Sequence, residues 1–330
     1  MTTRVIALAL GDPNGIGPEI AVAVATAPSV ENDASRLVLV GDAVVVRHYA
    51  DGATVRLVDP ADLPAAAPGT VDLVATEVLE PGAFRPGHCD AASGEATVAY
   101  VQRALDLVQN GHASAIVACP HNETAVNAAG IAFSGYPGLV ADLTGSRQDE
   151  VFLMLVGGGL RIVHATLHER LADALARLDA PLVAKAARAM CEALIALGIE
   201  APRIGLFGIN PHAGEAGLFG DDDDRVTFPA AAMLREEGVD VVGPQGADLL
   251  LTSGACDGFV AAYHDQGHIP IKLLAGRASS ALTIGAGVLF ASVGHGSAPD
   301  IAGRGLADPE PLRRAITLLN GAQPAGEATR

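Results

Sequence analysis

The sequence predicts an α/β protein in which a largely parallel sheet carries helices on its faces. Short β-branched runs alternate with alanine-rich segments of helical period along the 330 residues. Half of the residues are hydrophobic, 18% are charged and the mean hydropathy is +0.34. This composition supplies a large buried core and excludes intrinsic disorder.

The expected strands are short apolar runs of the buried type, at residues 5–10, 37–40, 71–74, 115–118 and 204–207. The expected helices have apolar residues at helical spacing, at residues 18–27, 94–110, 181–197 and 229–237. Residues 151–156 and 161–167 are joined by three glycines, which predicts an antiparallel hairpin beside the parallel strands.

The charge balance limits the possible partners. There are 38 acidic and 21 basic residues, for a net charge of −17, which repels nucleic acids and anionic membranes. No apolar run reaches the roughly 18–20 residues that a membrane-spanning helix needs. The four cysteines are far apart and form no CxxC motif, as expected of free thiols in a reducing compartment. The sequence therefore predicts a soluble, cytoplasmic protein that acts on a small molecule.

Glycine-rich and polar segments follow the expected strands. Residues 11–20, GDPNGIGPEI, form a strand–turn–helix pattern that presents backbone N–H groups to an anion, although a tight turn needs the same glycines. Residues 118–124 and 133–138 follow the strand that ends at Ala118. They could line a cleft, or they could be ordinary loops.

Three segments carry histidines: residues 163–168, 210–215 and 263–268. Imidazoles from separate loops are a common site for zinc, cobalt or ferrous iron, but a single histidine can equally be hydrogen-bonded without a metal. His164 and His168 are four residues apart on an expected strand, so they should lie about 13 Å apart and not share an ion.

Lys185 and Lys272 are the only lysines in the sequence. Lys272 follows His264 by eight residues in what is expected to be the same loop, and a lysine can release its proton where an arginine cannot. Lys185 lies on an expected amphipathic helix and should face solvent. The acidic run at residues 221–224 suggests either a calcium site or a solvated loop.

Residues 295–303, HGSAPDIAG, resemble the NAD-binding loop of the isopropylmalate and isocitrate dehydrogenases. Together with GDPNGIGPEI, NPHAGE, GPQGAD and YHDQG, in this order along the chain, they resemble the 4-hydroxythreonine-4-phosphate dehydrogenase family. The resemblance implies a homodimer that uses NAD and a divalent metal. It also implies two α/β/α domains of the isocitrate dehydrogenase type, residues 1–127 with 285–330 and residues 128–284, with the active site in the cleft between them.

The same resemblance implies site residues. The metal ligands would be His168, His212 and His264, contributed by both subunits and holding zinc, with cobalt, iron, manganese or magnesium as alternatives. The NAD contacts would be made by residues of the HGSAPDIAG loop and its preceding glycine: Gly294, His295, Gly296, Ser297, Ala298 and Asp300.

The chain departs from that family where the family binds its phosphorylated substrate. Residues 135–138 replace a Gly-His-Thr-Glu motif, residues 120–123 replace Pro-Ile-Asn-Lys, and Ala281 and Phe290 replace an asparagine and an arginine. Gly294 replaces an acid. The loss of cations and donors argues against a phosphate ester. At these positions the strings ACPHNETA, AGIAFSGYP and HDQGHIPIKLLA resemble the terephthalate dihydrodiol dehydrogenases.

This narrower resemblance implies NAD-dependent oxidation of a cis-dihydrodiol dicarboxylate to protocatechuate, CO2 and NADH. Lys272 would relay a proton or pair with a substrate carboxylate, and Asp248 and Asp265 would orient the metal or the lysine. Tyr136, His121, Asn122 and Lys272 would contact the substrate. The alternatives are a 4-hydroxythreonine-4-phosphate or related phospho-hydroxyacid dehydrogenase, and a catalytically silent protein that binds NAD or metal.

Overall fold

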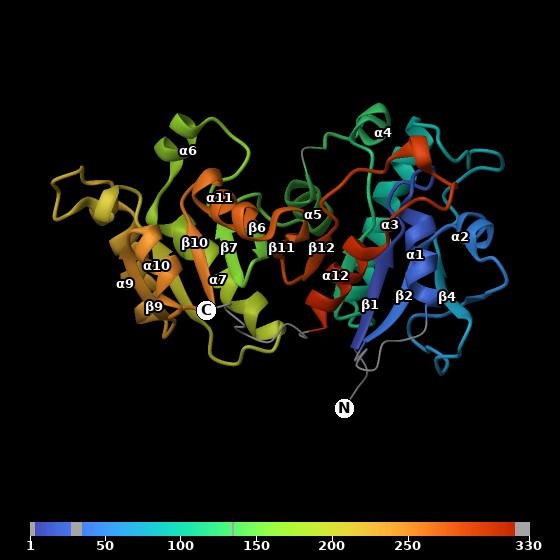
Figure 1. The fold of residues 1–330 in the computed structure, drawn as a ribbon, viewed down its shortest axis with the longest axis horizontal. Coiled ribbons are helices and arrows are strands. Elements are labelled where there is room, and N and C mark those ends of the chain that lie inside the picture. Colours follow the sequence, from blue (N-terminus) through green and yellow to red (C-terminus); the bar gives the residue numbers. More distant parts are fainter. Residues whose placement is uncertain (1–3, 28–34, 134, 321–330) are drawn as a thin grey trace. The chain divides into compact units, whose positions relative to one another are not determined.

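The computed structural model describes residues 4–27, 35–133 and 135–320 (Figure 1). The chain forms two compact units. The first runs to Leu139 and resumes at Gly287, and the second runs from Val140 to Ala286. No helix in the described ranges has the length and apolar composition needed to cross a membrane.

The first unit is built on an all-parallel sheet whose strands lie in the order β3-β4-β2-β1-β5-β12. Its strands are β1 (Arg4–Ala9), β2 (Ser35–Gly41), β3 (Thr54–Leu57), β4 (Thr70–Ala75), β5 (Ala115–Ala118) and β12 (Phe290–Ser292). The four strands predicted here, β1, β2, β4 and β5, are confirmed. β1 and β5 are apolar on both faces because both faces are covered, as expected of a parallel sheet.

Helices cover the sheet of the first unit: α1 (Gly17–Thr26), α2 (Ala43–Tyr49), α3 (Ala91–Gln109), α4 (Glu123–Ala128) and α12 (Glu310–Leu319), with a 3-10 turn, η3 (Pro299–Ile301). Helix α5 (Tyr136–Thr144) begins at the end of this unit. The carboxylate of Asp90 accepts the N–H of Ser93 at 2.9 Å and starts α3, which packs on β1, β2 and β5. The predicted helices α1 and α3 are confirmed to within a few residues.

A buried carboxylate ties three strands of this sheet together. Asp72 on β4 lies directly opposite Arg56 on β3, and the Arg56 Nε is 2.7 Å from the Asp72 Oδ1. Arg36 on β2 donates to the other carboxylate oxygen. Desolvation alone would raise the pKa of Asp72, but the two guanidinium groups outweigh it and hold the pKa below its ordinary value of 3.8.

We expect Asp72→Asn to lower the free energy of unfolding by about 1–3 kcal/mol at pH 7, below the full effect of a buried pair because both arginines are partly exposed. The native pKa is depressed, so the stabilisation is present above the unfolded pKa and is lost as the pH falls through the native one. Urea unfolding of the wild type and of Asp72→Asn should therefore show a difference in the free energy of unfolding that is constant down to about pH 4 and becomes smaller below it. A difference independent of pH would contradict this account.

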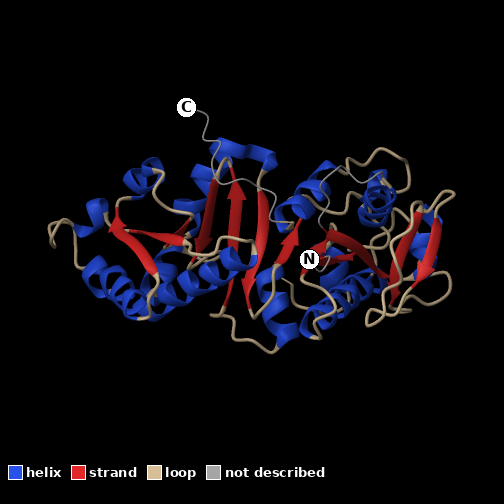
Figure 2. Cartoon of the chain, turned by 90° about the horizontal axis from the view of Figure 1, so that it is seen from below, coloured by secondary structure: helices blue, strands red, loops and turns tan. Residues whose placement is uncertain are grey.

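The second unit has a mixed sheet in the order β11-β6-β7-β10-β8-β9. Figure 2 draws the strands of the chain in red and the helices that cover them in blue. Its strands are β6 (Val151–Gly157), β7 (Leu160–His164), β8 (Arg203–Phe207), β9 (Asp240–Gln245), β10 (Gly258–Ala261) and β11 (Ser280–Gly285). The strands β7, β10, β8 and β9 are parallel, and β6 is antiparallel to both of its neighbours. The predicted strand β8 and the predicted hairpin of β6 and β7 are confirmed.

The helices of the second unit are α6 (Leu171–Arg177), α7 (Ala180–Ala196), α8 (Asp222–Arg225), α9 (Thr227–Glu236), α10 (Ala247–Ser253) and α11 (His264–Ala275), with the 3-10 turns η1 (Pro211–Gly214) and η2 (Gly276–Ala278). The predicted α7 and α9 are confirmed. Successive residues of β10 face opposite sides of the sheet. A side chain at Gly258 would strike Met190 of α7, whereas Phe259 packs with Leu250 of α10 and Ile271 of α11. Helices α7 and α11 therefore cover opposite faces.

Two predicted local structures are wrong in ways that matter for the site. The strand β7 ends at His164 and does not continue to residue 167, because the chain turns toward the end of β10, where the Thr166 hydroxyl donates to the Ala262 carbonyl at 2.7 Å. The segment from His264 to Lys272 is helix α11 and not a loop, even though Pro270 lies inside it. Burial of Ile271 in the core favours this helix over the local proline signal.

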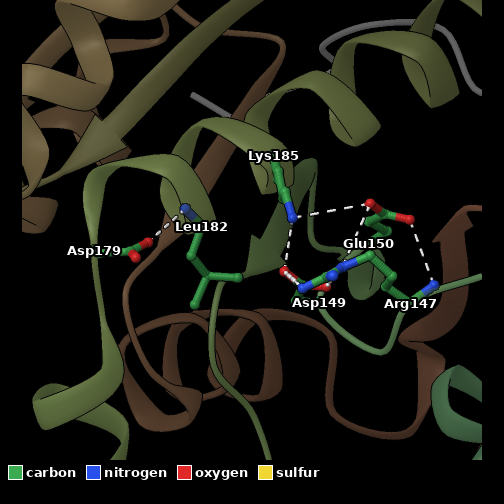
Figure 3. A network of polar contacts seen from close by, with 6 residues as sticks. All are labelled: Arg147, Asp149, Glu150, Asp179, Leu182 and Lys185. Atoms are coloured by element: carbon green, nitrogen blue, oxygen red, sulfur yellow. Dashed lines mark hydrogen bonds and ion pairs between the residues drawn. The ribbon is translucent and has the colours of Figure 1, made fainter.

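Lys185 is not simply a solvent-facing residue of α7. Its Nζ donates to the Asp149 carboxylate at 2.6 Å, and its side chain is only 31% exposed (Figure 3). Arg147 bonds to the same carboxylate at 2.8 Å, and these two cations hold the pKa of Asp149 well below its usual range. Lys185 therefore has a structural ion pair.

Candidate active site

The first candidate region is the meeting point of two loops in the first unit. The turn after β1 and the loop after β12 lie at the same edge of the sheet, because β1 and β12 both flank β5 in parallel. The Ile16 N–H donates to the Ser297 carbonyl at 2.8 Å, and the Ser297 N–H donates to the His121 carbonyl at 3.2 Å. A side chain at Gly15 would lie 2.5 Å from the Ser297 Cβ, so only glycine allows this approach.

A cavity of about 480 Å³ opens above these loops and is lined by residues 121–123 and 293–299. Of the predicted NAD contacts, Gly294, His295 and Gly296 are exposed, and a Cβ on either glycine would meet open space. Asp300 is exposed in η3, Ala298 has a left-handed backbone, and Ser297 is buried against the neighbouring turn. Exposed backbone around a cavity of this size fits part of a nucleotide cofactor.

Two fully buried polar side chains lie in the turn that supports this loop. The Asp12 Oδ1 accepts the Asn14 N–H at 3.0 Å, while Oδ2 accepts no hydrogen bond within the described residues. Burial raises the pKa of Asp12, although the Asn14 N–H and the nearby hydroxyls of Ser297 and Ser93 act in the opposite direction. The Asn14 Oδ1 accepts the Arg85 N–H, but the Asn14 Nδ2 has no hydrogen-bond partner among the described residues.

Three of the predicted substrate contacts lie in or beside the same cavity. Asn122 lines it and also starts α4, because its Oδ1 accepts the Ala125 N–H. His121 lines it too, and burial lowers its pKa despite Glu123 at 3.9 Å. Tyr136 is buried among aromatic rings with its hydroxyl 3.4 Å from the Cys119 carbonyl, and burial raises its pKa far above its usual range.

The second candidate region is a group of histidines in the second unit. His168 follows β7 and His264 begins α11, and their ring centroids are 5.6 Å apart beside a cavity of about 320 Å³. His164 and His268 lie against them, with the His164 ring 6.4 Å from that of His264. The prediction placed His164 and His168 on one strand, but β7 ends at His164, so His168 lies beyond the strand. Both rings are near the ring of His264.

Carboxylates hold two of the three candidate ligands. The His264 Nδ1 is 2.7 Å from Asp265 Oδ1, and the His212 Nδ1 is 2.7 Å from Glu215 Oε2. In each pair the Nδ1 proton faces the carboxylate, so Nε2 presents a lone pair, which is the usual arrangement of metal-binding histidines. These donors fit a metal such as zinc. Sequence reasoning named Asp265 but missed Glu215, whose signal was its spacing of three residues from His212.

His212 lies on a strained loop that follows β8. The backbone of His212 and Ala213 is left-handed, with φ values of 53° and 55°. Asp223 anchors this loop by accepting the N–H groups of Ile209 and Asn210 at 2.8 and 2.9 Å. Strain of this kind is often found at functional sites. Within the described ranges, no three His, Cys, Asp or Glu side chains converge to hold a metal.

The acidic run at residues 221–224 makes hydrogen bonds and ion pairs within the protein, which argues against a calcium site there. Asp223 is buried and also accepts the Thr227 hydroxyl, and Asp222 accepts from Asn210 and Arg225.

The remaining predicted catalytic residues lie on two helices of the same unit. Lys272 is exposed near the end of α11 and donates to the Ser279 hydroxyl at 2.7 Å. It is eight residues after His264 on one helix, which corresponds to a rise of about 12 Å along the helix axis. Asp248 is exposed in the first turn of α10.

Comparison with known proteins places the chain in a family. The sequence model described as "Pyridoxal phosphate biosynthetic protein PdxA" matches residues 33–319. The chain belongs to the PdxA family. Its mixed α/β fold is similar to those of solved members, including a 4-hydroxythreonine-4-phosphate dehydrogenase from Burkholderia phymatum, which is 35% identical with a TM-score of 0.88 over 97% of this chain and 98% of that one.

Two other relatives of this PdxA-family chain have a higher sequence identity to it than the Burkholderia phymatum protein. A 1,2-dihydroxy-3,5-cyclohexadiene-1,4-dicarboxylate dehydrogenase from Comamonas sp is 46% identical, over 97% of this chain and 98% of the relative. The crystal structure of a terephthalate 1,2-cis-dihydrodiol dehydrogenase from Burkholderia xenovorans LB400 is 56% identical, with a TM-score of 0.81 over 96% of this chain and 98% of that one. All three proteins are named as dehydrogenases.

Proposed function

We propose that this chain is an NAD- and metal-dependent dehydrogenase that converts terephthalate cis-dihydrodiol to protocatechuate, CO2 and NADH. The observation that carries the proposal is the 46% and 56% identity, over nearly the whole chain, to two proteins named for this substrate. The identity to a 4-hydroxythreonine-4-phosphate dehydrogenase is lower, at 35%. The homodimer and the cytoplasmic location are part of the proposal.

The reaction balances as one diol dianion and one NAD+ giving one protocatechuate monoanion, one CO2 and one NADH, because the proton lost from the carbinol is taken up again after CO2 leaves. Oxidation of the secondary carbinol produces a ketone β to a carboxylate, and such an acid loses CO2 readily. Here the loss of CO2 also restores the aromatic ring. When bound, NAD would accept the hydride, and a divalent metal, zinc by preference, would lower the pKa of the hydroxyls as a Lewis acid.

The first unit would contribute the NAD loop and the second the metal ligands, within the two-domain, isocitrate dehydrogenase-like arrangement with boundaries at residues 127 and 285. His168, His212 and His264 would hold the metal. A ligand set drawn from two subunits would be complete only in the dimer, and within the described residues of one chain no three such side chains converge. Asp265 would orient His264, and Glu215 would do the same for His212.

Substrate binding must overcome electrostatic repulsion, because the proposed dicarboxylate substrate is a dianion and the protein has a net charge of −17. Local cations are therefore required. Lys272 would pair with a substrate carboxylate or relay a proton, with Asp248 orienting the metal or the lysine. Tyr136, His121 and Asn122 would shape the substrate site. Residues 121–123 and 293–299, which line the first cavity, include no lysine or arginine, so a cation for the substrate carboxylates would have to come from elsewhere.

We expect the purified full-length protein, supplied with NAD, Zn²⁺ or Co²⁺ and the dihydrodiol, to release NADH, protocatechuate and CO2 in equal amounts. NADH absorbance and chromatography of the product measure this directly. Turnover of 4-phosphohydroxythreonine but not of the diol would instead support the phospho-hydroxyacid dehydrogenase alternative. No turnover of either, with metal and NAD bound, would support a silent binding protein.

A further inference from the structure

A buried histidine lies beneath the candidate metal ligands and has no role in the function proposed above. His164 is 1% exposed at the end of β7. Its Nδ1 is 3.1 Å from the Leu153 carbonyl oxygen on β6, and its Nε2 is 3.0 Å from the Nδ1 of His268 on α11. A Cβ at position 267 would lie 2.4 Å from that Nε2, so Gly267 allows α11 to pack against the ring.

These contacts determine where the protons lie. A carbonyl oxygen only accepts, so the Nδ1 of His164 carries the hydrogen that faces Leu153. A second proton on this ring would place an imidazolium in a buried site among other imidazoles, so Nε2 presents a lone pair. His268 must therefore donate its Nδ1 hydrogen to His164, with the His264 carbonyl as a weaker acceptor at 3.3 Å. The Nε2 of His268 is then unprotonated.

The ring held in this way supports the candidate ligand His264. The His268 and His264 rings are stacked, with centroids 3.7 Å apart and planes 14° apart. Asp265 holds one edge of His264, and His268 covers one of its faces. The lone pairs of two parallel rings do not converge on one point, so His268 does not share an ion with His264 in this arrangement. Its contact orients the ligand ring.

We propose that His164 and His268 are positioning residues, linked in the order Leu153 carbonyl, His164, His268, that fix the ring plane of His264 for metal binding. This inference rests on the proposed metal site. It assigns no contact with substrate to either residue. It explains why two imidazoles, one of them fully buried, lie next to a ligand that already has a carboxylate partner.

Two variants separate the hydrogen bond between His268 and His164 from the stacking of His268 on His264. His268→Phe keeps a flat ring against His264 but removes the donor to His164, whereas His268→Asn keeps an N–H donor but removes the stacked ring. We expect each to weaken Co²⁺ binding by the full-length apoprotein about tenfold or more, as loss of outer partners commonly does. Competition with a chromophoric chelator measures the affinity, and the visible Co²⁺ spectrum reports ligand geometry. His112→Ala, in the first unit, is the matched control and should bind Co²⁺ like the wild type.

Nitrogen-15 spectra of histidine-labelled wild-type apoprotein provide a test that needs no variant. His164 and His268 should both appear as Nδ1–H tautomers, and an Nε2–H tautomer at His268 would overturn the proposal. Wild-type affinity and an unchanged Co²⁺ spectrum in both variants would also overturn it. Failure of the metal site itself looks different, because His264→Ala would then leave Co²⁺ affinity unchanged.

Discussion

His264→Ala should reduce kcat/KM for the dihydrodiol by about 10³-fold or more. The substitution removes a candidate ligand whose Nδ1 is bound to Asp265 and whose Nε2 is available to a metal. Lewis-acid stabilisation contributes several kcal/mol to a transition state, and about 4 kcal/mol corresponds to a factor of 10³ in rate. Steady-state NADH formation, together with metal content after dialysis, measures the effect.

Asp265→Ala provides an internal comparison for this prediction. It leaves the imidazole in place and removes only its carboxylate partner, so the expected loss is smaller, about 10–100-fold. His112→Ala should leave both rate and metal content unchanged. A His264→Ala protein that retained wild-type metal content and turnover would refute the assignment of this residue as a ligand.

Gly15→Ala should raise the Kd for NAD by about tenfold or more. The added methyl group would lie 2.5 Å from the Ser297 Cβ and 2.7 Å from the Ser297 carbonyl oxygen. The contacting atoms include backbone, so relief requires the loop of residues 294–300 to move. Since that loop is the proposed NAD-binding segment, its displacement should weaken cofactor binding, measured by fluorescence titration of NADH.

The control for Gly15→Ala is a substitution that adds methyl groups at an exposed position, where no neighbouring atoms are displaced. Ala66→Val lies on an exposed loop of the same unit and should leave both NADH affinity and the thermal midpoint unchanged. Overpacking at Gly15 should also cost about 1–3 kcal/mol of stability, so NADH affinity is compared well below the thermal midpoint. Unchanged NADH affinity in folded Gly15→Ala protein would show that this loop does not bind the cofactor.

Sequence patterns predicted the two longest helices and several buried strands correctly, but missed helix α12 and strands β9 and β11. The buried strand β1 and the long helices α3 and α7 have strong periodicity, together with capping residues such as Asp90 and Asp179. The short strands β3, β10 and β12 have only three or four residues, too few for a period to be read. The segment of helix α11 was expected to be a loop. Gly267 and Pro270 within it are local helix breakers, and its packing on the core overrides them.

In the candidate site, too, some residues could be predicted from the sequence and others only from the structure. Motifs identified His168, His212 and His264, and the structure brings the first and third together. The partners that orient these rings were missed. The spacing of Glu215 from His212, or of His268 from His264, does not by itself show a contact, and only the structure places the members of each pair 2.7 or 3.7 Å apart. Asp223 was seen only as part of an acidic run, although it anchors the loop that holds His212.

By itself, the sequence predicted the α/β class and argued against nucleic acid and membrane partners, and its motifs resembled those of the family to which the chain belongs. The class and the charge follow from composition and periodicity, and the resemblance follows from short motifs, all of which are local properties of the chain. The candidate site residues remain a proposal. Only the tertiary structure decided that His164 is buried, that it contacts His268 of helix α11 and that Gly15 lies against Ser297. The reason is physical: hydrogen-bond direction and close packing depend on atoms that are distant in sequence, and no local pattern encodes their approach.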